Sequence, residues 1–316
     1  MKKKELINTP GLIVKGNSLI EARCKFDVYE ARILAWCTAQ IGRYDDDFTM
    51  YKLKRSDAVK LLGFYENISI KRIRELLKKM HRHVIEIKDP KLDMGKEGWI
   101  DVSLITRSQY NSNTEEFWFR IHEDLKPFLL QLTGGNFTKL DFMTILQFKN
   151  AHTVRFYEIC RKELMQNSEV LFHRDLEEFK ATLGIPGKYK KYPDFKLRIL
   201  DPVIEELRNI ADMELEVIAS KMGGKKFVSL QFEVKMIDPR RSGYWLQMRS
   251  FGLADKKISE LLTTYGREII DETLRKCGSQ LTAKQFKNGT AIDNPAGVFL
   301  TKLKEVASNI GVQTFF

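Results

Sequence analysis

The chain has 316 residues, 43% of them hydrophobic and 11% aromatic, which is enough apolar material for more than one buried core in a globular protein. Lys and Arg number 53 against 42 Asp and Glu, and the net charge of +11 suits a polyanionic partner, either nucleic acid or an anionic membrane surface. No run of about 18 apolar residues is present to span a bilayer, and the basic N-terminus lacks the apolar core of a signal peptide. We therefore expect a cytoplasmic protein without a membrane partner.

The cysteines are far apart in the sequence and form no C-x-x-C pair. This spacing favours neither a disulfide framework nor a zinc ribbon. We expect each thiol to be a small packed hydrophobe in a reducing compartment. The residues concerned are Cys24, Cys37, Cys160 and Cys277.

Two stretches of the chain repeat the same order of elements. Each begins with an amphipathic helix, predicted over 18–42 in the first stretch and over 142–166 in the second, and a short strand follows each helix. Identity between the stretches is low, so the repeat is one of architecture and not of sequence. Coincidence is the alternative interpretation.

A helix-Gly-helix arrangement comes next in both stretches. In the first, the helical pattern is interrupted at Gly63 and restarts at Asn67 or Ser69, residue types that cap helix N-termini. In the second, Gly184 precedes a helix predicted over 192–211. This arrangement is typical of a helix-turn-helix, whose second helix is the recognition helix.

Alternating apolar and polar residues follow the recognition helix in both stretches. Segments 84–89 and 98–111 flank a turn-rich sequence, and segment 213–237 turns at Gly223-Gly224, so both stretches are predicted to end in a β-hairpin, the wing. The predicted fold class is α+β, with two tandem winged-helix domains followed by a small helical C-terminal module. The boundaries are a flexible tail at 1–12, winged helix 1 at 13–140, winged helix 2 at 141–240 and the helical module at 241–316.

Motifs for catalysis or a bound cofactor are absent from the sequence. It contains no G-x-x-x-x-G-K-[ST] loop, no G-x-S-x-G elbow and no H-E-x-x-H helix. The nearest candidates for a metal site are His81 with His83 and the acidic run Asp45 to Asp47, but polar residues at the end of a basic helix and a solvated loop explain them better. We expect a binding protein, not an enzyme, with no metal and no cofactor.

The recognition helix of the first domain carries a basic face. Its apolar positions, expected to face the core, are Ile70, Ile73, Leu77 and Met80. The opposite face can neutralise phosphates, and the residues at the helix start can reach base edges. A solvated basic face is the alternative. The DNA-binding candidates here are Ser69, Lys71, Arg72, Arg74 and Lys78.

The second recognition helix carries a denser basic cluster around its start. Phe195, Ile199, Val203 and Leu207 are expected to be its buried face. Arg198 is then free to contact a guanine in the major groove. The candidates are Lys188, Lys190, Lys191, Tyr192, Lys196 and Arg198, with Lys225 and Lys226 in the wing; Lys91, Lys96 and Lys221 are further basic residues of the two hairpins. Two such modules predict a site of roughly 20 bp of double-stranded DNA, which a monomer can cover.

Three segments resemble the iteron-binding plasmid replication initiators, a family with paired winged helices. They are "FDVYEARILAWC", "FYEICRKEL" and "FHRDLEEFKATLGIPGKYKKYPDFKLRILDPVIEEL", and the likeness spans roughly residues 13–240. The resemblance implies a protein that binds direct repeats of a plasmid origin, helps melt adjacent DNA, and recruits the host initiator and the replicative helicase. It assigns base contacts to the second domain, through Lys191, Lys196 and Arg198, and backbone contacts and dimerisation to the first.

The same resemblance implies a homodimer that represses its own gene and dissociates to monomers that bind iterons. The apolar strand "FWFRI" is a candidate β-edge contact for the dimer, with ordinary core as the alternative. "NPAGVFLTKLKE" looks like segments appended to some family members, and partner docking and structural support are equally good roles for the C-terminal module. Competing functions are a winged-helix transcription repressor without initiation activity and a metal-dependent nuclease or nucleotidyltransferase.

Overall fold

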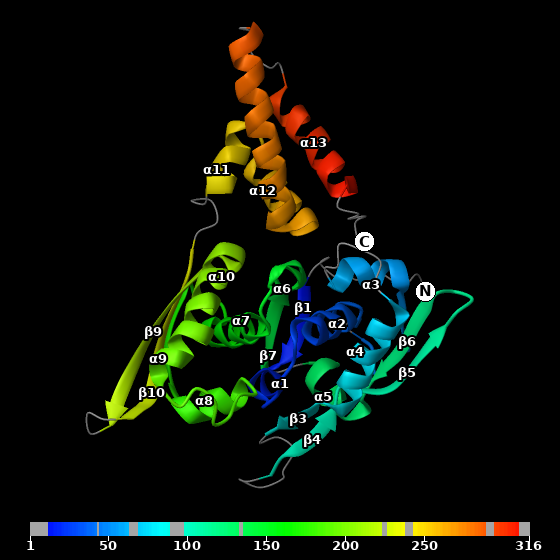
Figure 1. The fold of residues 1–316 in the computed structure, drawn as a ribbon, viewed down its shortest axis with the longest axis vertical. Coiled ribbons are helices and arrows are strands. Elements are labelled where there is room, and N and C mark those ends of the chain that lie inside the picture. The colour runs from blue at the N-terminus through cyan, green and yellow to red at the C-terminus, as the bar shows by residue number, and fades with distance from the viewer. Residues whose placement is uncertain are drawn as a thin grey trace. The chain divides into compact units, whose positions relative to one another are not determined.

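Figure 1 shows the computed structural model of the chain. It describes residues 12–42, 44–62, 69–88, 98–132, 135–222, 226–237, 243–288 and 294–309. The described residues fall into two compact units, one from Leu12 to Met236 and the other from Ile237 onward. The first unit contains both winged helices, so the predicted α+β fold is confirmed.

The first winged helix has the predicted order of a helix, a strand, a helix-turn-helix and paired strands. Its elements are β1 (Leu12–Gly16), α1 (Asn17–Glu21), α2 (Val28–Ala39), β2 (Tyr51–Lys54), α3 (Arg55–Leu62), α4 (Ile70–Arg82), β3 (Val84–Ile87), β4 (Ile100–Ser103), β5 (Ile105–Asn111), β6 (Glu116–Ile121), η2 (Glu123–Leu125), α5 (Lys126–Leu129) and β7 (Phe137–Asp141). β1 pairs antiparallel with β7, which joins the start of this domain to its end.

The helix predicted over 18–42 is two helices, α1 and α2. The Asp27 carboxylate accepts hydrogen bonds from the backbone N–H groups of Tyr29 and Glu30, both at 2.9 Å, and Glu30 accepts one from the Asp27 N–H at 2.8 Å. This capping box starts a new helix. Just before it, Arg23 forms an isolated backbone bridge with Glu86, which holds the chain extended between the two helices.

The strand predicted over 98–111 is also divided. β4 pairs with β3, whereas β5 pairs with β6 in a sheet of order β2-β6-β5. Val102, Leu104 and Ile105 are all buried, and two consecutive buried residues break the alternation of a single strand, so the chain bends between the two sheets. The turn of the β3–β4 hairpin, with Lys91 and Lys96, lies outside the described residues.

The strand "FWFRI" forms most of β6. β6 has β2 on one side and β5 on the other, and Phe117, Phe119 and Ile121 are buried. The prediction of a free β-edge here is wrong, because both edges of β6 already have partners. Ordinary core, the alternative, is confirmed.

The second winged helix repeats the plan, and β8, β10 and β9 form one antiparallel sheet in that order. Its elements are α6 (Phe142–Gln147), α7 (Ala151–Leu164), β8 (Glu169–Asp175), α8 (Leu176–Thr182), α9 (Tyr192–Phe195), η3 (Lys196–Leu200), α10 (Asp201–Ala211), β9 (Met213–Met222) and β10 (Lys226–Met236). The helix predicted over 142–166 is interrupted before Asn150, whose side chain caps α7 by accepting from the His152 N–H at 2.9 Å.

A buried ion cluster joins α7 to the N-terminal elements β1 and α1. Glu158 of α7 contacts Lys15 at 2.5 Å and Arg155 at 2.9 Å, and all of these side chains are almost fully buried. Arg155 also donates to the carbonyls of Ile20 at 2.7 Å and Ala22 at 2.9 Å. The cluster therefore connects segments more than 130 residues apart in the sequence.

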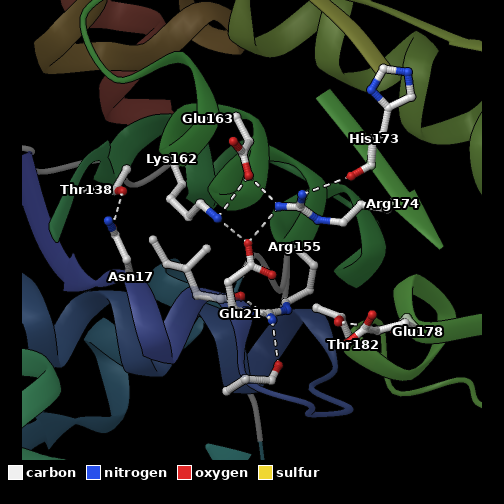
Figure 2. Close-up of polar contacts among 12 residues, drawn as sticks. Asn17, Glu21, Thr138, Arg155, Lys162, Glu163, His173, Arg174, Glu178 and Thr182 are labelled. Atoms are coloured by element: carbon white, nitrogen blue, oxygen red, sulfur yellow. Dashed lines mark hydrogen bonds and ion pairs between the residues drawn. The ribbon is translucent and has the colours of Figure 1, made fainter. Parts of the chain in front are cut away.

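Figure 2 shows a second, more exposed network beside the first. Glu21 of α1 contacts Lys162 of α7 and Arg174 of β8, the latter at 3.0 Å. Glu163 also contacts both cations and lies 2.9 Å from Lys162. Through Glu21, the first winged helix is thus tied to the sheet of the second.

Glu30 is a fully buried carboxyl at the N-terminus of α2. Its Oε1 lies 2.8 Å from His83 Nδ1 at the end of α4, and Oε2 lies 3.7 Å from Lys79 Nζ. Burial raises the pKa of Glu30 to about 7, although the Asp27 N–H and Lys79 favour the ionised form. Because the folded-state pKa is raised, folding favours the protonated carboxyl. The free energy of unfolding therefore falls as the pH rises from the ordinary pKa of a glutamate in the unfolded chain toward 7.

We predict that Glu30→Gln removes this pH dependence. The wild type should lose about 1 to 3 kcal/mol more than the variant between pH 5 and pH 8, because the amide stays neutral and still accepts from Asp27. Urea unfolding at both pH values measures the difference. Parallel stability profiles for the two proteins would show that Glu30 does not titrate in this range.

The C-terminal unit is helical. Its elements are α11 (Gly243–Ser250), α12 (Asp255–Asn288) and α13 (Pro295–Asn309), and α12 is kinked at Gly266, where the backbone is not helical (φ 71°). Its core includes Trp245, Met248, Ile258 and Phe299. A bilayer-spanning helix, long and apolar, is not found within the described ranges.

All four cysteines are buried free thiols. Burial raises the pKa of each of them, the first cause in every case. The thiolate is thereby disfavoured, which confirms the prediction of packed rather than reactive cysteines.

Candidate nucleic-acid interface

α4 occupies the position of the recognition helix in the first domain. Ser69 is its N-cap, and its Oγ accepts from the Arg72 N–H at 3.2 Å. Ile73, Leu77 and Met80 are buried as predicted, but Ile70 is 37% exposed, because it lies in the first position of the helix, a turn beyond the part that packs. The hydroxyl of Ser69 therefore has a structural role as a cap in addition to its predicted place near DNA.

The predicted basic candidates of α4 all lie on its exposed side: Lys71, Arg72, Arg74 and Lys78. Lys78 forms an ion pair with Glu75 at 2.9 Å one turn away. Lys71 and Arg74 have no ion-pair partner among the residues the structure describes. Lys79, beside this face, instead contacts Asp27, the N-cap of α2, at 2.6 Å and links the two helices.

The loop before the second recognition helix presents three exposed lysines, Lys188, Lys190 and Lys191. Its shape depends on left-handed backbone at Gly187 (φ 68°) and Tyr189 (φ 50°). Lys180 of α8, only 1% exposed, donates to the Tyr189 carbonyl at 3.2 Å and pairs with Glu177 at 2.9 Å. This supporting lysine was not predicted from the sequence, because a Glu and Lys three residues apart on a helix usually form an exposed pair.

Tyr192 connects the second recognition helix to the wing. Its ring is half-buried, with its centroid 4.4 Å from that of Phe227 in β10, and burial raises the pKa of its hydroxyl. On the same Phe227 ring lies the ammonium of Lys221 from β9, 4.8 Å from the centroid. Lys225 lies outside the described residues, and Lys226 begins β10 but its side chain is not described.

The second recognition helix runs continuously through α9, η3 and α10. Phe195, Ile199, Val203 and Leu207 are buried, as predicted. Arg198 is exposed on the other side, whereas Lys196 contacts Asp201 at 2.5 Å, a hydrogen bond that raises the pKa of the lysine. Of these two cations, Arg198 is thus the better placed to contact a base.

Lys25, shortly before the N-cap of α2, was not among the residues predicted from the sequence. It is exposed and packs against Gly184 of the second domain. Burial lowers the pKa of both His83 and His152, and Lys25 adds to the effect on each, together with Lys79 at His83 and Lys188 at His152. Lys25 is therefore within electrostatic reach of both domains, a proximity that only the folded chain creates.

Several of the residues considered for a metal site contact other protein side chains. His81 contacts Ser108 at 3.0 Å, His83 faces Glu30, and Asp47 contacts Arg120 at 2.8 Å and Lys126 at 3.0 Å. Hydrogen bonds from these two cations lower the pKa of Asp47 to about 2. Within the described part of the chain, no three His, Cys, Asp or Glu side chains are grouped to hold a metal ion.

The fold and these exposed helices define a tandem winged-helix protein with a basic recognition helix in each domain. Residues 12–161 match the first winged helix of the initiator replication proteins, and residues 175–234 match the second. The chain belongs to this family of replication initiators. The first match extends past the predicted boundary at 140 and includes α6 and most of α7.

Two known proteins are similar along most of the chain. A replication initiation protein of Escherichia coli is 23% identical over 231 residues, which cover 71% of this chain and 70% of that protein. The crystal structure of the Pi initiator protein in complex with iteron DNA superimposes with a TM-score of 0.60 at 17% identity, covering 72% of this chain and 98% of the other.

Proposed function

We propose that this protein initiates plasmid replication by binding direct repeats of the origin, the iterons, as a two-domain reader of double-stranded DNA. The observation that supports this most strongly is that both recognition helices bury an apolar face and expose a basic one within a single compact unit. Family membership supplies the link to initiation, and the Pi initiator is a relative of the same fold whose structure holds iteron DNA.

The two domains contribute differently to the proposed complex. α4 supplies phosphate contacts through Lys71 and Arg74, and its N-terminus with Ser69 lies toward the bases. The second domain supplies base contacts through Arg198, with the loop lysines Lys190 and Lys191 on the backbone. Since phosphate contacts release counterions, affinity should fall steeply with salt.

Arg198→Ala is expected to weaken binding to the direct repeats by about 1 to 3 kcal/mol and to relax discrimination against altered repeats, the loss typical of one bidentate contact to guanine. Fluorescence anisotropy with the repeats beside the gene, at fixed salt, measures both effects. Arg208→Ala is the matched control, because Arg208 is exposed on the same helix about 15 Å further along.

The control should bind like the wild type. Unchanged affinity and selectivity of Arg198→Ala would remove its assigned role. Failure of the wild type to prefer the repeats over scrambled DNA would overturn the proposed function, and preference for a lone inverted repeat would indicate a transcription repressor.

Further steps of the proposed function follow from the family. We propose that the chain helps melt adjacent DNA, recruits the host initiator and replicative helicase in the bacterial cytoplasm, and performs no catalysis. We also propose a homodimer that represses its own gene and dissociates to the iteron-binding monomer. Since β6 is internal, a dimer that extends the β2-β6-β5 sheet would use the edge of β2 or β5.

A further inference from the structure

Leu197 is an exposed leucine in the middle of the second recognition helix. Its side chain is 68% exposed, while Phe195, Ile199 and Leu200 around it are each at most 2% exposed. Exposed single apolar residues are common on protein surfaces and mean little alone. Here the position is unusual because both chain neighbours, Lys196 and Arg198, are exposed cations on the helix proposed to enter the groove.

The backbone around Leu197 departs from a regular α-helix. Residues 196–200 form a π turn, in which the Asp201 N–H donates to the Lys196 carbonyl five residues earlier. Pro202 follows and has no N–H to continue the α-helical pattern at Arg198, which explains why the wider turn forms here. π turns within helices are frequent at functional sites.

The π turn changes which side chains share a face. Each residue advances by about 80° instead of about 100°. Counted from Phe195, Ile199 and Leu200 return to within roughly 40° of its direction, so both can be buried, whereas Leu197 lies roughly 160° away. An uninterrupted α-helix would turn Leu200 about 140° away from Phe195 and out of the core, whereas Leu197 would point away from the core in either geometry. The π turn therefore accounts for the burial of Leu200 beside Ile199, while Leu197 faces outward.

The ion pair between Lys196 and Asp201 has the same origin. Residues five apart are neighbours on a π turn, and their 2.5 Å contact fixes the Lys196 ammonium along the helix. Of the three consecutive exposed side chains, this leaves Leu197 and Arg198 pointing outward without such a contact among the described residues. Arg198 suits guanine, and an aliphatic side chain suits the one apolar group on a base edge in the major groove, the C5-methyl of thymine.

We propose that Leu197 is a specificity-determining residue that contacts a thymine methyl group in each direct repeat. The inference depends on the proposed function, since it assigns a base contact within the same DNA complex. It explains an exposed apolar side chain on the basic face of this helix, where a solvent-facing position would normally carry a polar residue.

The test uses repeat DNA in which each thymine is replaced in turn by deoxyuridine, which lacks only the methyl group. The wild-type full chain should lose about fourfold in affinity at one thymine, the change that corresponds to one buried methyl group at about 0.8 kcal/mol. Leu197→Ala should bind the unmodified repeat with a similar loss and show no further loss with deoxyuridine. Because the side chain is exposed, the variant should keep the wild-type melting temperature.

Leu171→Ala is the matched control, since Leu171 is a comparably exposed leucine on β8, at 54%. It should bind normally and keep the sensitivity to deoxyuridine. The inference is overturned if the wild type binds the repeats but tolerates every deoxyuridine, or if Leu197→Ala keeps the same sensitivity, as a leucine that contacts a protein partner would. If the wild type does not bind the repeats at all, the proposed function fails, and the role of Leu197 fails with it.

Discussion

Replacing Gly184 by alanine should destabilise the unit that contains both winged helices by about 2 to 4 kcal/mol. Gly184 has a φ of 68°, and a Cβ there would lie 2.5 Å from the Cys24 carbonyl and 2.6 Å from the Lys25 Cβ. Two costs therefore add, left-handed strain for an alanine and a clash with backbone of the other domain. The backbone on both sides would have to move apart.

Gly187→Ala separates these two costs. Gly187 has the same φ of 68°, but nothing lies within 4 Å of its Cβ position. We expect it to cost only about 1 kcal/mol, the strain alone. Thermal and urea unfolding of the full chain measure both variants. Equal losses for the two glycines would contradict the close approach of the domains at Gly184.

Glu158→Gln should also strongly destabilise the protein, with an expected loss of about 3 to 5 kcal/mol in the free energy of unfolding. Burial disfavours the Glu158 carboxylate, but Lys15 and Arg155 outweigh it, so the pKa of this group lies below its ordinary value. An amide cannot compensate these two buried cations. Leaving a buried charge without its partner is far more costly than losing an exposed pair.

Two further variants make the Glu158 prediction specific. Lys15→Met combined with Glu158→Gln should recover part of the loss, because it removes one of the uncompensated charges. Glu260→Gln, which breaks an exposed pair with Lys257, should change stability little. Urea unfolding compares them. A loss from Glu158→Gln no larger than that of the exposed control would show that the cluster does not stabilise the fold.

Local patterns predicted the elements that recognise DNA well. Ile73, Leu77 and Met80 recur at helical spacing and are buried in α4, Ser69 caps that helix, and the apolar face from Phe195 to Leu207 is buried as expected. These features depend on residues within a few turns of one another. For that reason, they can be predicted from a single sequence.

The features that prediction missed depend on residues distant in the chain. The break between α1 and α2 is held by contacts to Glu86, and the position of β6 inside its sheet depends on which strands pair with it. Likewise, no local pattern places Lys25 against Gly184 or buries Lys15 beside Glu158. The π turn depends on both local and distant residues. Pro202 is evident in the sequence, but the turn also requires a core that can bury both Ile199 and Leu200.

The sequence therefore predicted which residues are exposed at the candidate site better than it predicted how they are paired and arranged. The candidates described by the structure, from Lys71 to Lys78 and from Lys188 to Arg198, are exposed except for Tyr192, which packs against the wing. Lys196 is paired with Asp201 and Lys78 with Glu75, whereas Lys71, Arg74 and Arg198 form no ion pair within the described part of the chain. Direct contact with DNA stays a prediction for each of them.

Replication of a minimal plasmid tests the central claim most directly. The plasmid carries the DNA beside the gene, with its direct repeats, as its only origin, and the protein is supplied from a second replicon. We predict that the wild type and Arg208→Ala maintain this plasmid and that Arg198→Ala, expressed at the same level, does not. A wild-type protein that binds the repeats but never maintains the plasmid would contradict initiation and leave a DNA-binding repressor.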